Sequence, residues 1–317
     1  MAEFTSPAAP AGAPRRTVME RVFLGPYGLR AGWRLVIYLF LASVCTAVPS
    51  AAAAQTRWEG SQFVQLCCAL CGASVAGWIM LRFVDRRSPR ALGFALDGSA
   101  ARDFAGGTAI GGGILAFAVL LLAVAGTARW VAEPGTVPEY VAALLSALVF
   151  FTVAAAVEEV IMRGYPLQVL VQGMGAWPAL VATSAAFAWL HRNNPGVTPL
   201  ALANIFLAGL MLGVAYLRTR SLWFATAVHM GWNWTMQSLL DFPVSGLSLY
   251  DIPFYDARET GADWWTGGGF GPEAGVAATV ALLAGTVWLA RTPQLRPDAR
   301  MTALRPLVDD RIGERWP

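Results

Sequence analysis

Ionisable side chains are rare in the long apolar stretches of this sequence, and five of them could support chemistry there. Two adjacent carboxylates, Glu158 and Glu159, follow the apolar run LVFFTVAAAV, and Arg163 comes four residues after Glu159. The chain has only two histidines, His191 and His229, and each lies in an apolar segment. Because an ionisable group inside a membrane span is costly, each of these residues is by default a candidate for function.

Helical spacing separates the expected roles of the two glutamates. Glu159 and Arg163 are i,i+4 on a helix, so they can pair along one face. Glu158 points about 100° away from Glu159 and has no such local partner. One carboxylate is therefore expected to be neutralised by Arg163, which leaves Glu158 available as a general base. The alternative is that both glutamates only join helices together through Arg163.

The two histidine segments carry further groups at one-turn spacing. Phe187 and His191 are i,i+4 in FAWLH, so the ring can support the imidazole. His229 and Asn233 are i,i+4 in HMGWN, and Gly231 between them permits a neighbouring helix to approach closely. The amide of Asn233 could donate to a developing oxyanion, or it could form an ordinary interhelical hydrogen bond.

Other catalytic patterns are absent from the sequence. It contains no HExxH zinc motif, no GxGD aspartyl pair and no GxSxG nucleophile elbow. The four cysteines lie in apolar runs without polar or histidine neighbours, and we interpret them as small core residues despite one CxxC spacing. They are Cys45, Cys67, Cys68 and Cys71. What remains is a set of Glu, His, His and Asn, which can activate a water molecule.

The composition predicts an all-α, polytopic membrane protein. Hydrophobic residues make up 56% of the chain and charged residues 14%, and the mean hydropathy is +0.51. We expect about eight transmembrane helices, since apolar runs of about 20 residues recur along the chain. They cover residues 33–54, 62–84, 104–126, 140–172, 176–193, 199–217, 221–240 and 274–290. This divides the chain into a flexible N-terminal tail (1–31), a membrane domain (32–291) and a C-terminal tail (292–317).

Arginine placement predicts the orientation of these helices. Arginines precede the first span and follow the second, sixth and eighth spans, and an even number of spans puts all these segments on one side. The positive-inside rule makes that side, with both termini, cytoplasmic. All 23 basic residues are arginine, a bias typical of GC-rich bacteria, which favours a bacterial plasma membrane. No dense basic face remains for a nucleic-acid partner.

Helix depth allows the candidate residues to meet in one pocket below the cytoplasmic surface. Counted from the cytoplasmic helix ends, Glu158 and His191 lie about 20 Å deep and His229 about 12 Å deep. The expected partners are the lipid bilayer and a peptide or membrane-tethered protein substrate.

The motifs EEVIMR, FAWLH and HMGWN occur in this order on separate predicted helices. Together they resemble the CPBP family, which comprises CAAX protease and bacteriocin-processing (Abi) proteins, including type II CAAX prenyl endopeptidases and lysostaphin-resistance-like proteins. The run NIFLAGLMLGVAYLRTRSLWFATAVHMGWN (204–233) is especially similar, and the resemblance covers about residues 140–240.

The resemblance implies an eight-helix intramembrane endopeptidase that cleaves a peptide bond near the cytoplasmic membrane face. By analogy, Glu158 and His191 activate the hydrolytic water, and His229 and Asn233 stabilise the oxyanion. Glu159 and Arg163 then occupy the supporting positions of the first motif.

Metal involvement is left open by these residues. In a metalloendopeptidase, Glu158, His191 and His229 would bind zinc, with Glu159 as base. In the metal-free reading, which we favour and which needs no cofactor, Glu158 and His191 act on water directly. A non-catalytic membrane scaffold or bacteriocin-immunity protein of the same family is the alternative function. A proton-coupled transporter would also use buried carboxylates and histidines, but the paired broken helices typical of transporters are not evident.

Overall fold

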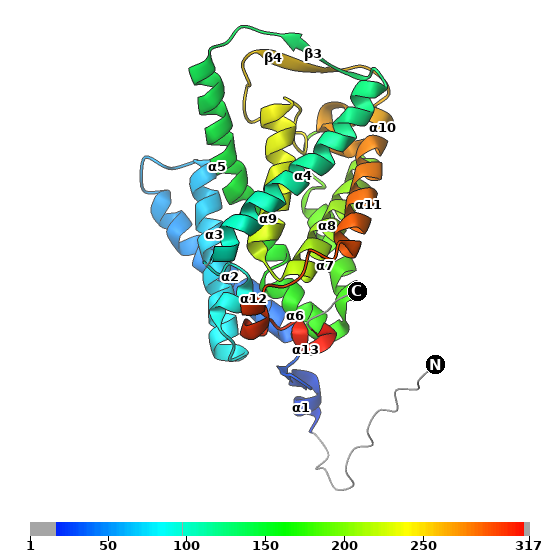
Figure 1. Cartoon of the computed structure of the whole chain (residues 1–317). Coiled ribbons are helices and arrows are strands. Elements are labelled where there is room, and N and C mark those ends of the chain that lie inside the picture. Colours follow the sequence, from blue (N-terminus) through cyan, green and yellow to red (C-terminus); the bar gives the residue numbers. More distant parts are fainter. Residues whose placement is uncertain (1–16, 97, 314–317) are drawn as a thin grey trace, which may run out of the picture.

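The apolar runs of the sequence fold as antiparallel helices in a computed structural model that describes residues 17–96 and 98–313 (Figure 1). The long helices are α2 (Ala31–Ala53), α3 (Gln62–Ile79), α4 (Gly98–Val124), α5 (Val137–Met162), α7 (Ala176–Leu190), α8 (Pro199–Thr219), α9 (Leu222–Trp234) and α11 (Val276–Arg291). Single π-helical turns extend α3 through Met80–Val84 and α9 through Thr235–Leu239. These helices correspond in order to the eight predicted spans.

Five segments of the described chain are long and apolar enough to cross a membrane. They are Ala31–Ala53, Gln62–Val84, Gly98–Val124, Val137–Met174 and Pro199–Thr219. Helices α7 and α11 are apolar but shorter. Large apolar side chains on α2, such as Phe40 and Val48, are about two-thirds exposed, as expected where a helix contacts lipid. The fold is therefore that of an all-α membrane protein, whereas the number of spans and the location of the termini stay predictions.

The fourth predicted span is broken, which corrects the expected continuous run over 140–172. Helix α5 ends at Met162, and a separate helix, α6 (Tyr165–Met174), follows. Pro166 lies in the first turn of α6, where its ring is tolerated but where it disfavours continuation of the preceding helix. At Gly164, an added Cβ would lie 2.3 Å from the Val160 carbonyl oxygen, so only glycine fits this bend.

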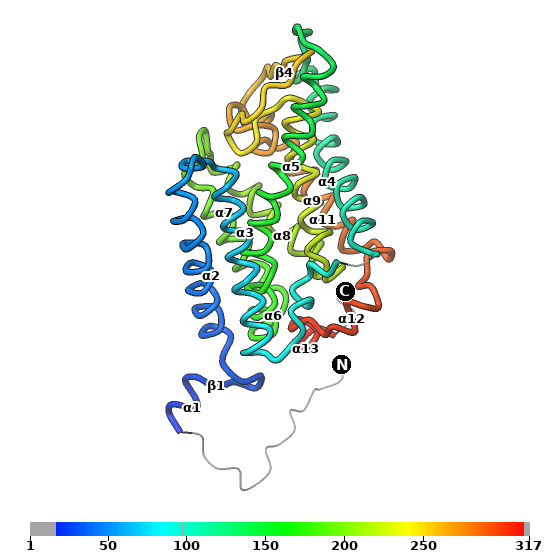
Figure 2. Tube along the Cα trace, turned by 90° about the vertical axis from the view of Figure 1, so that its left-hand side faces the viewer, coloured from blue at the N-terminus to red at the C-terminus, as the bar shows by residue number. Residues whose placement is uncertain are grey.

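The bundle has two different ends, which Figure 2 shows well separated. One end, here the arginine-rich end, carries the short helices α1 (Val18–Phe23), α6, α12 (Ala299–Leu304) and α13 (Asp309–Ile312), and near it a hairpin of β1 (Leu24–Gly25) and β2 (Gly28–Leu29). Ion pairs join segments there: Arg34–Asp85, Arg87–Asp310 and Arg220–Asp309. The division into tails and membrane domain stays a prediction, and residues 1–16 of the N-terminal tail lie outside the described residues.

The opposite, arginine-poor end carries a small sheet that the helical pattern did not predict. Strand β3 (Ala128–Ala132) pairs antiparallel with β4 (Tyr255–Glu259), with Ala128 opposite Glu259 and Ala132 opposite Tyr255. The short helix α10 (Asp263–Thr266) lies at the same end (Figure 1). The sheet joins the α4–α5 connection to the long loop that precedes α11.

Helix α9 packs very closely against α4, and this contact fixes the position of His229. A Cβ at Gly231 would lie 2.4 Å from the Thr108 carbonyl oxygen, and a Cβ at Gly111 would lie 1.9 Å from the Val228 carbonyl oxygen. Small residues that let helix backbones approach are typical of membrane helix interfaces. The close approach anticipated at Gly231 is therefore present, with α4 as the neighbour.

Candidate active site

The last turn of α5 holds a buried ion pair that links three helices. Arg163 Nη1 donates to Glu159 Oε1 at 2.9 Å, and both side chains are fully buried. Arg163 Nη2 donates to the Gly209 carbonyl oxygen of α8 at 3.0 Å. The guanidinium also lies over the Phe187 ring of α7, 4.6 Å from its centroid. The i,i+4 pair expected from the sequence is thus formed, and it ties α5 to α7 and α8.

Glu159 has a second partner that sequence spacing did not indicate. Its Oε1 atom lies 3.0 Å from His229 Nδ1 on α9. A carboxylate accepts hydrogen bonds, so Nδ1 of His229 is the protonated nitrogen and Nε2 points away from Glu159. The buried ion pair therefore orients one of the two imidazoles.

The second imidazole is oriented by its own helix. His191 is the first residue after α7, and its Nδ1 lies 2.8 Å from the Phe187 carbonyl oxygen one turn earlier. Because a backbone carbonyl only accepts, Nδ1 carries a proton, and Nε2 is the nitrogen that bears the lone pair in the uncharged tautomer. The Phe187 ring also packs against both imidazoles, with centroid distances of 4.7 Å to His191 and 5.9 Å to His229.

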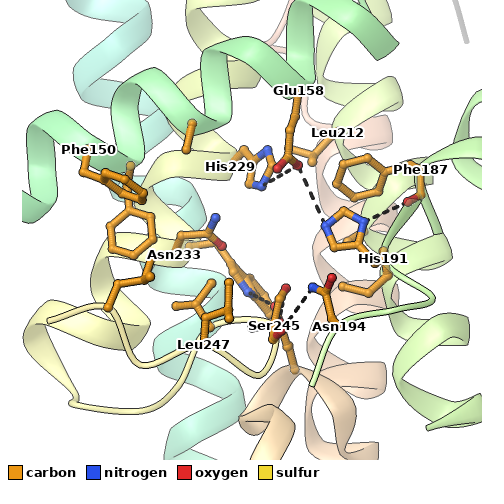
Figure 3. Close-up of a pocket in the computed structure, with 18 of the residues that line it drawn as sticks. Phe150, Glu158, Phe187, His191, Asn194, Leu212, His229, Asn233, Ser245 and Leu247 are labelled. Atoms are coloured by element: carbon orange, nitrogen blue, oxygen red, sulfur yellow. Dashed lines mark hydrogen bonds and ion pairs between the residues drawn. The ribbon is translucent and has the colours of Figure 1, made fainter. Parts of the chain in front are cut away.

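Glu158 lies between the two imidazoles (Figure 3). Its Oε2 atom is 3.8 Å from His229 Nε2 and 4.0 Å from His191 Nε2. This oxygen is shielded from solvent and has no hydrogen-bond partner among the described residues, although the side chain as a whole is 39% exposed. An orphaned carboxylate oxygen facing two ring nitrogens just beyond hydrogen-bond range leaves a position that a water molecule could bridge.

These groups line one cavity of about 160 Å³. Glu158, Phe187, His191, His229 and Asn233 all contribute to its wall. Figure 3 shows Asn233 directed into the cavity from the same helix as His229. The supporting residues Glu159 and Arg163 lie behind the wall. The structure therefore brings all seven predicted residues together, and their catalytic roles stay predictions.

A tight turn covers part of this cavity and was missed by the sequence reasoning. Val244 and Leu247 pair across a turn whose central residues, Ser245 and Gly246, both have positive φ, as a type I′ turn requires. At Gly246 an added Cβ would meet the Pro195 carbonyl oxygen at 2.0 Å, so the turn packs directly on the α7–α8 loop.

A buried carboxylate holds the turn in place. Glu273 Oε1 accepts hydrogen bonds from the backbone N–H of Ser245 at 2.6 Å and from its hydroxyl at 2.7 Å. Glu273 Oε2 accepts from Trp232 Nε1 of α9 at 3.2 Å. Asn194 Nδ2, from the α7–α8 loop, donates to the Ser245 carbonyl oxygen at 3.1 Å. Burial raises the pKa of Glu273, while its hydrogen-bond donors and His191 oppose that rise.

The sequence alone did not identify Glu273 as part of the site, although its position in a glycine-rich segment is distinctive. The residue is a lone acidic group in the glycine-rich segment TGGGFGPEAG, far in sequence from the turn that it binds. Charge in a loop normally indicates solvent exposure. Only the fold shows that this carboxylate is buried against the cavity.

The three residues proposed as zinc ligands do not fit a zinc ion as they are arranged. Two donors on one tetrahedral zinc, each about 2.0–2.2 Å from the metal, lie ~3.4 Å apart. The Glu158 oxygen is 3.8 and 4.0 Å from the two nitrogens. Among residues 17–96 and 98–313, no group of three or more His, Cys, Asp or Glu side chains has metal-binding geometry.

Fold and site together define an integral membrane protein whose helices enclose a pocket lined by a carboxylate and two imidazoles. Residues 140–235 match a family model described as type II CAAX prenyl endopeptidase Rce1-like. No curated protein and no solved structure matches the chain. The matched segment contains Glu158, His191 and His229, and it supports assignment to the CPBP/CAAX protease family. The family that this segment matches is one of proteases.

Proposed function

We propose that the protein is an intramembrane endopeptidase that hydrolyses a peptide bond with a water molecule activated by Glu158 and His191. The observation that carries the proposal is the unpartnered Glu158 oxygen, held 3.8–4.0 Å from two ring nitrogens inside one cavity. A water in this position donates one hydrogen bond to Glu158 and one to the lone pair of His191 Nε2. Both water protons are then engaged in these hydrogen bonds, and a lone pair of the water oxygen faces the substrate.

The reaction follows from these hydrogen bonds. Glu158 takes a proton as the water oxygen attacks the scissile carbonyl carbon, which gives a tetrahedral intermediate with a negative oxygen. The intermediate collapses when the C–N bond breaks, and the proton held by Glu158 passes to the leaving amine. Water is consumed, one carboxyl product and one amine product are formed, and Glu158 returns to its ionised form.

Two further groups that line the cavity supply donors for the negative oxygen. His229 in its cationic form has an N–H at Nε2 as well as at Nδ1, and the Glu159 carboxylate at Nδ1 favours that form. The Asn233 amide comes from the same face of α9. Arg163 neutralises Glu159 in turn, so the carboxylate is not left as an isolated charge in an apolar environment.

A metal-free mechanism and a bacterial plasma-membrane location are both part of the proposal. The spacing of Glu158, His191 and His229 supports direct acid–base chemistry on water. The exclusive use of arginine as the basic residue supports a bacterial source. A peptide, or a protein tethered to the membrane, is the substrate class that a cavity enclosed by helices can receive from the bilayer.

The decisive experiment compares membrane proteomes of cells that carry the wild type, Glu158→Gln or Glu59→Gln. Glu158→Gln keeps the side-chain shape but removes the base, and should reduce cleavage roughly 10²–10⁴-fold. Glu59 is an exposed loop carboxylate, and its variant should cleave normally. Uncut substrates should accumulate only with Glu158→Gln. Normal processing by a well-inserted Glu158→Gln protein contradicts the proposal, and a phenotype that also survives His229→Ala would instead indicate a non-catalytic scaffold or immunity protein.

A further inference from the structure

The cavity is built from the arginine-poor half of the bundle. Its wall includes Gln62 and Leu66 from the beginning of α3, Asn194 from the α7–α8 loop, and the Val244–Leu247 turn. The first two segments lie toward the end that carries the β3–β4 sheet, and the turn follows α9 at the same end (Figures 1 and 2). Among the described residues that line the cavity, none belongs to a connection at the arginine-rich end.

The opposite side of the cavity is closed. Directly beyond Glu158 along α5 lie Glu159 and Arg163, both fully buried, and then Tyr165 at the beginning of α6, also fully buried. These residues form the floor of the cavity, and the hydrogen bond from Arg163 to the Gly209 carbonyl oxygen joins α5 to α8 across it. Below it, the Tyr165 hydroxyl donates to Asp85, which is paired with Arg34. Water and substrate therefore reach Glu158 from the arginine-poor end.

The charge distribution assigns the two ends to different sides of the membrane. Within the described chain, the arginine-poor end has four arginines: Arg57, Arg129, Arg192 and Arg258. The arginine-rich end carries many more: Arg21, Arg30, Arg34, Arg82, Arg86, Arg87, Arg90, Arg102, Arg218, Arg220, Arg291, Arg296, Arg300, Arg305 and Arg311. Many of these flank the ends of membrane helices within a few residues, where arginine is most effective in fixing orientation. The arginine-rich end is therefore cytoplasmic.

We infer that the cavity opens on the non-cytoplasmic side of the membrane and receives extracytoplasmic segments of exported or membrane-anchored proteins. The substrate part of this inference rests on the proposed function, whereas the orientation does not. The two sequence-based expectations, a cytoplasmic arginine-rich end and a cleavage site near the cytoplasmic face, cannot both hold in this fold. We keep the cytoplasmic arginine-rich end and replace the expected cleavage site near the cytoplasmic face. Depth counted along the helices did not show which end of the cavity is closed.

The lining also indicates the kind of segment that fits. Apolar side chains of α5, α8, the covering turn and the residues that follow it surround the polar groups: Phe150, Phe151, Leu212, Leu247 and Leu249. Such walls favour apolar substrate side chains next to the scissile bond. The substrate is thus a chain segment on the non-cytoplasmic side of the membrane, close to the membrane surface, with apolar residues on both sides of the scissile bond.

Labelling of single cysteines with a membrane-impermeant maleimide tests the orientation without any activity assay. The four native cysteines are first replaced by alanine. Thr260→Cys then reports the arginine-poor end, Ala303→Cys in α12 reports the arginine-rich end, and Leu247→Cys reports the cavity; all three positions are exposed. In intact cells, Thr260→Cys and Leu247→Cys should reach the labelling level of permeabilised cells. Ala303→Cys should be labelled only after permeabilisation.

Either of two results overturns the inference. Labelling of Ala303→Cys in intact cells, alone or with the other two, shows that the arginine-rich end is not confined to the cytoplasm. Labelling of Thr260→Cys without Leu247→Cys shows that the cavity does not open where the structure places its mouth. An immunoblot of total and membrane fractions confirms that each variant is inserted at the wild-type level.

The substrate class is decided by the topology of the proteins that accumulate with Glu158→Gln. Accumulating proteins whose cut sites face the cytoplasm contradict the inference but leave the proposed protease intact. If nothing accumulates while the labelling holds, the proposed function fails and the orientation stands. The two failures are therefore distinguishable.

Discussion

Replacing Glu159 by glutamine should both destabilise the protein and misplace His229. Glu159 Oε1 is shared between Arg163 Nη1 at 2.9 Å and His229 Nδ1 at 3.0 Å, and the carboxylate is fully buried. Glutamine keeps an acceptor oxygen, but it leaves the Arg163 cation buried without a counter-charge. Removing one partner of a buried ion pair typically costs about 3–5 kcal/mol. We therefore expect the free energy of unfolding of Glu159→Gln to fall by that amount.

Two further variants separate stability from orientation. In Glu159→Gln/Arg163→Met the uncompensated charge is gone, so most of the lost stability should return, since apolar replacement of a buried pair is often close to neutral. Hydrolysis should remain about 10²-fold below wild type in Glu159→Gln and in the double variant, because His229 no longer has a carboxylate at Nδ1. Asp85→Asn is the matched control, since it breaks the equally buried Arg34–Asp85 pair outside the cavity.

Equilibrium unfolding in mixed micelles and cleavage of a protein that accumulates with Glu158→Gln provide the two measurements. The control should lose stability like Glu159→Gln but retain wild-type hydrolysis per folded molecule. Wild-type hydrolysis by folded Glu159→Gln would refute the orienting role of this carboxylate. Unchanged stability of Glu159→Gln would refute the assumption that Arg163 depends on it.

Three other predictions follow from particular contacts. Gly231→Ala should lower the free energy of unfolding by roughly 1–3 kcal/mol because its Cβ would meet the α4 backbone, whereas Gly113→Ala on α4, with open space around it, should not, as thermal unfolding can test. Burial raises the pKa of Glu259 from its ordinary value of 4.5 to about 7, so the folded protein holds this proton more tightly than the unfolded chain does. The contribution of protonated Glu259 to the free energy of unfolding is therefore lost as pH rises from 4.5 through 7. Amide exchange in the β3–β4 sheet, corrected for intrinsic rates, should rise between pH 5 and pH 8, and Glu259→Gln should remove that rise. Metal analysis of purified protein should find no stoichiometric zinc and cleavage should survive a chelator; one zinc per chain that disappears in His191→Ala would contradict the metal-free reaction.

Much of the candidate site could be predicted because its key relationships are local. The Glu159–Arg163 pair and the Phe187–His191 contact depend only on one-turn helical spacing, which the sequence displays directly. The helical segments were equally accessible from apolar run length, apart from the bend at Gly164. There the Tyr165–Pro166 pair was visible, but the apolar run around it suggested one uninterrupted helix.

Contacts between distant segments could not be predicted in this way. The hydrogen bond between Glu159 and His229 joins residues 70 positions apart, and the bond between Ser245 and Glu273 lies within an irregular loop. The β3–β4 pairing depends on where the long connections return, which no periodicity records. Depth counted along each helix also failed to show the closed floor at Arg163, because it treats every helix as straight and independent.

The opening of the cavity at one end explains why the chain needs two adjacent glutamates. A single buried carboxylate in an apolar bundle would tend to take up a proton, and a protonated acid cannot accept one from water. Here Glu159 and Arg163 form a closed, charge-balanced floor, and Glu158, turned about 100° from Glu159, faces the cavity with 39% of its side chain exposed. Glu158 is open to solvent on the cavity side, while the pair behind it holds His229 in place. The geometry that lets water reach Glu158 therefore also determines the end of the bundle at which the proposed substrate enters.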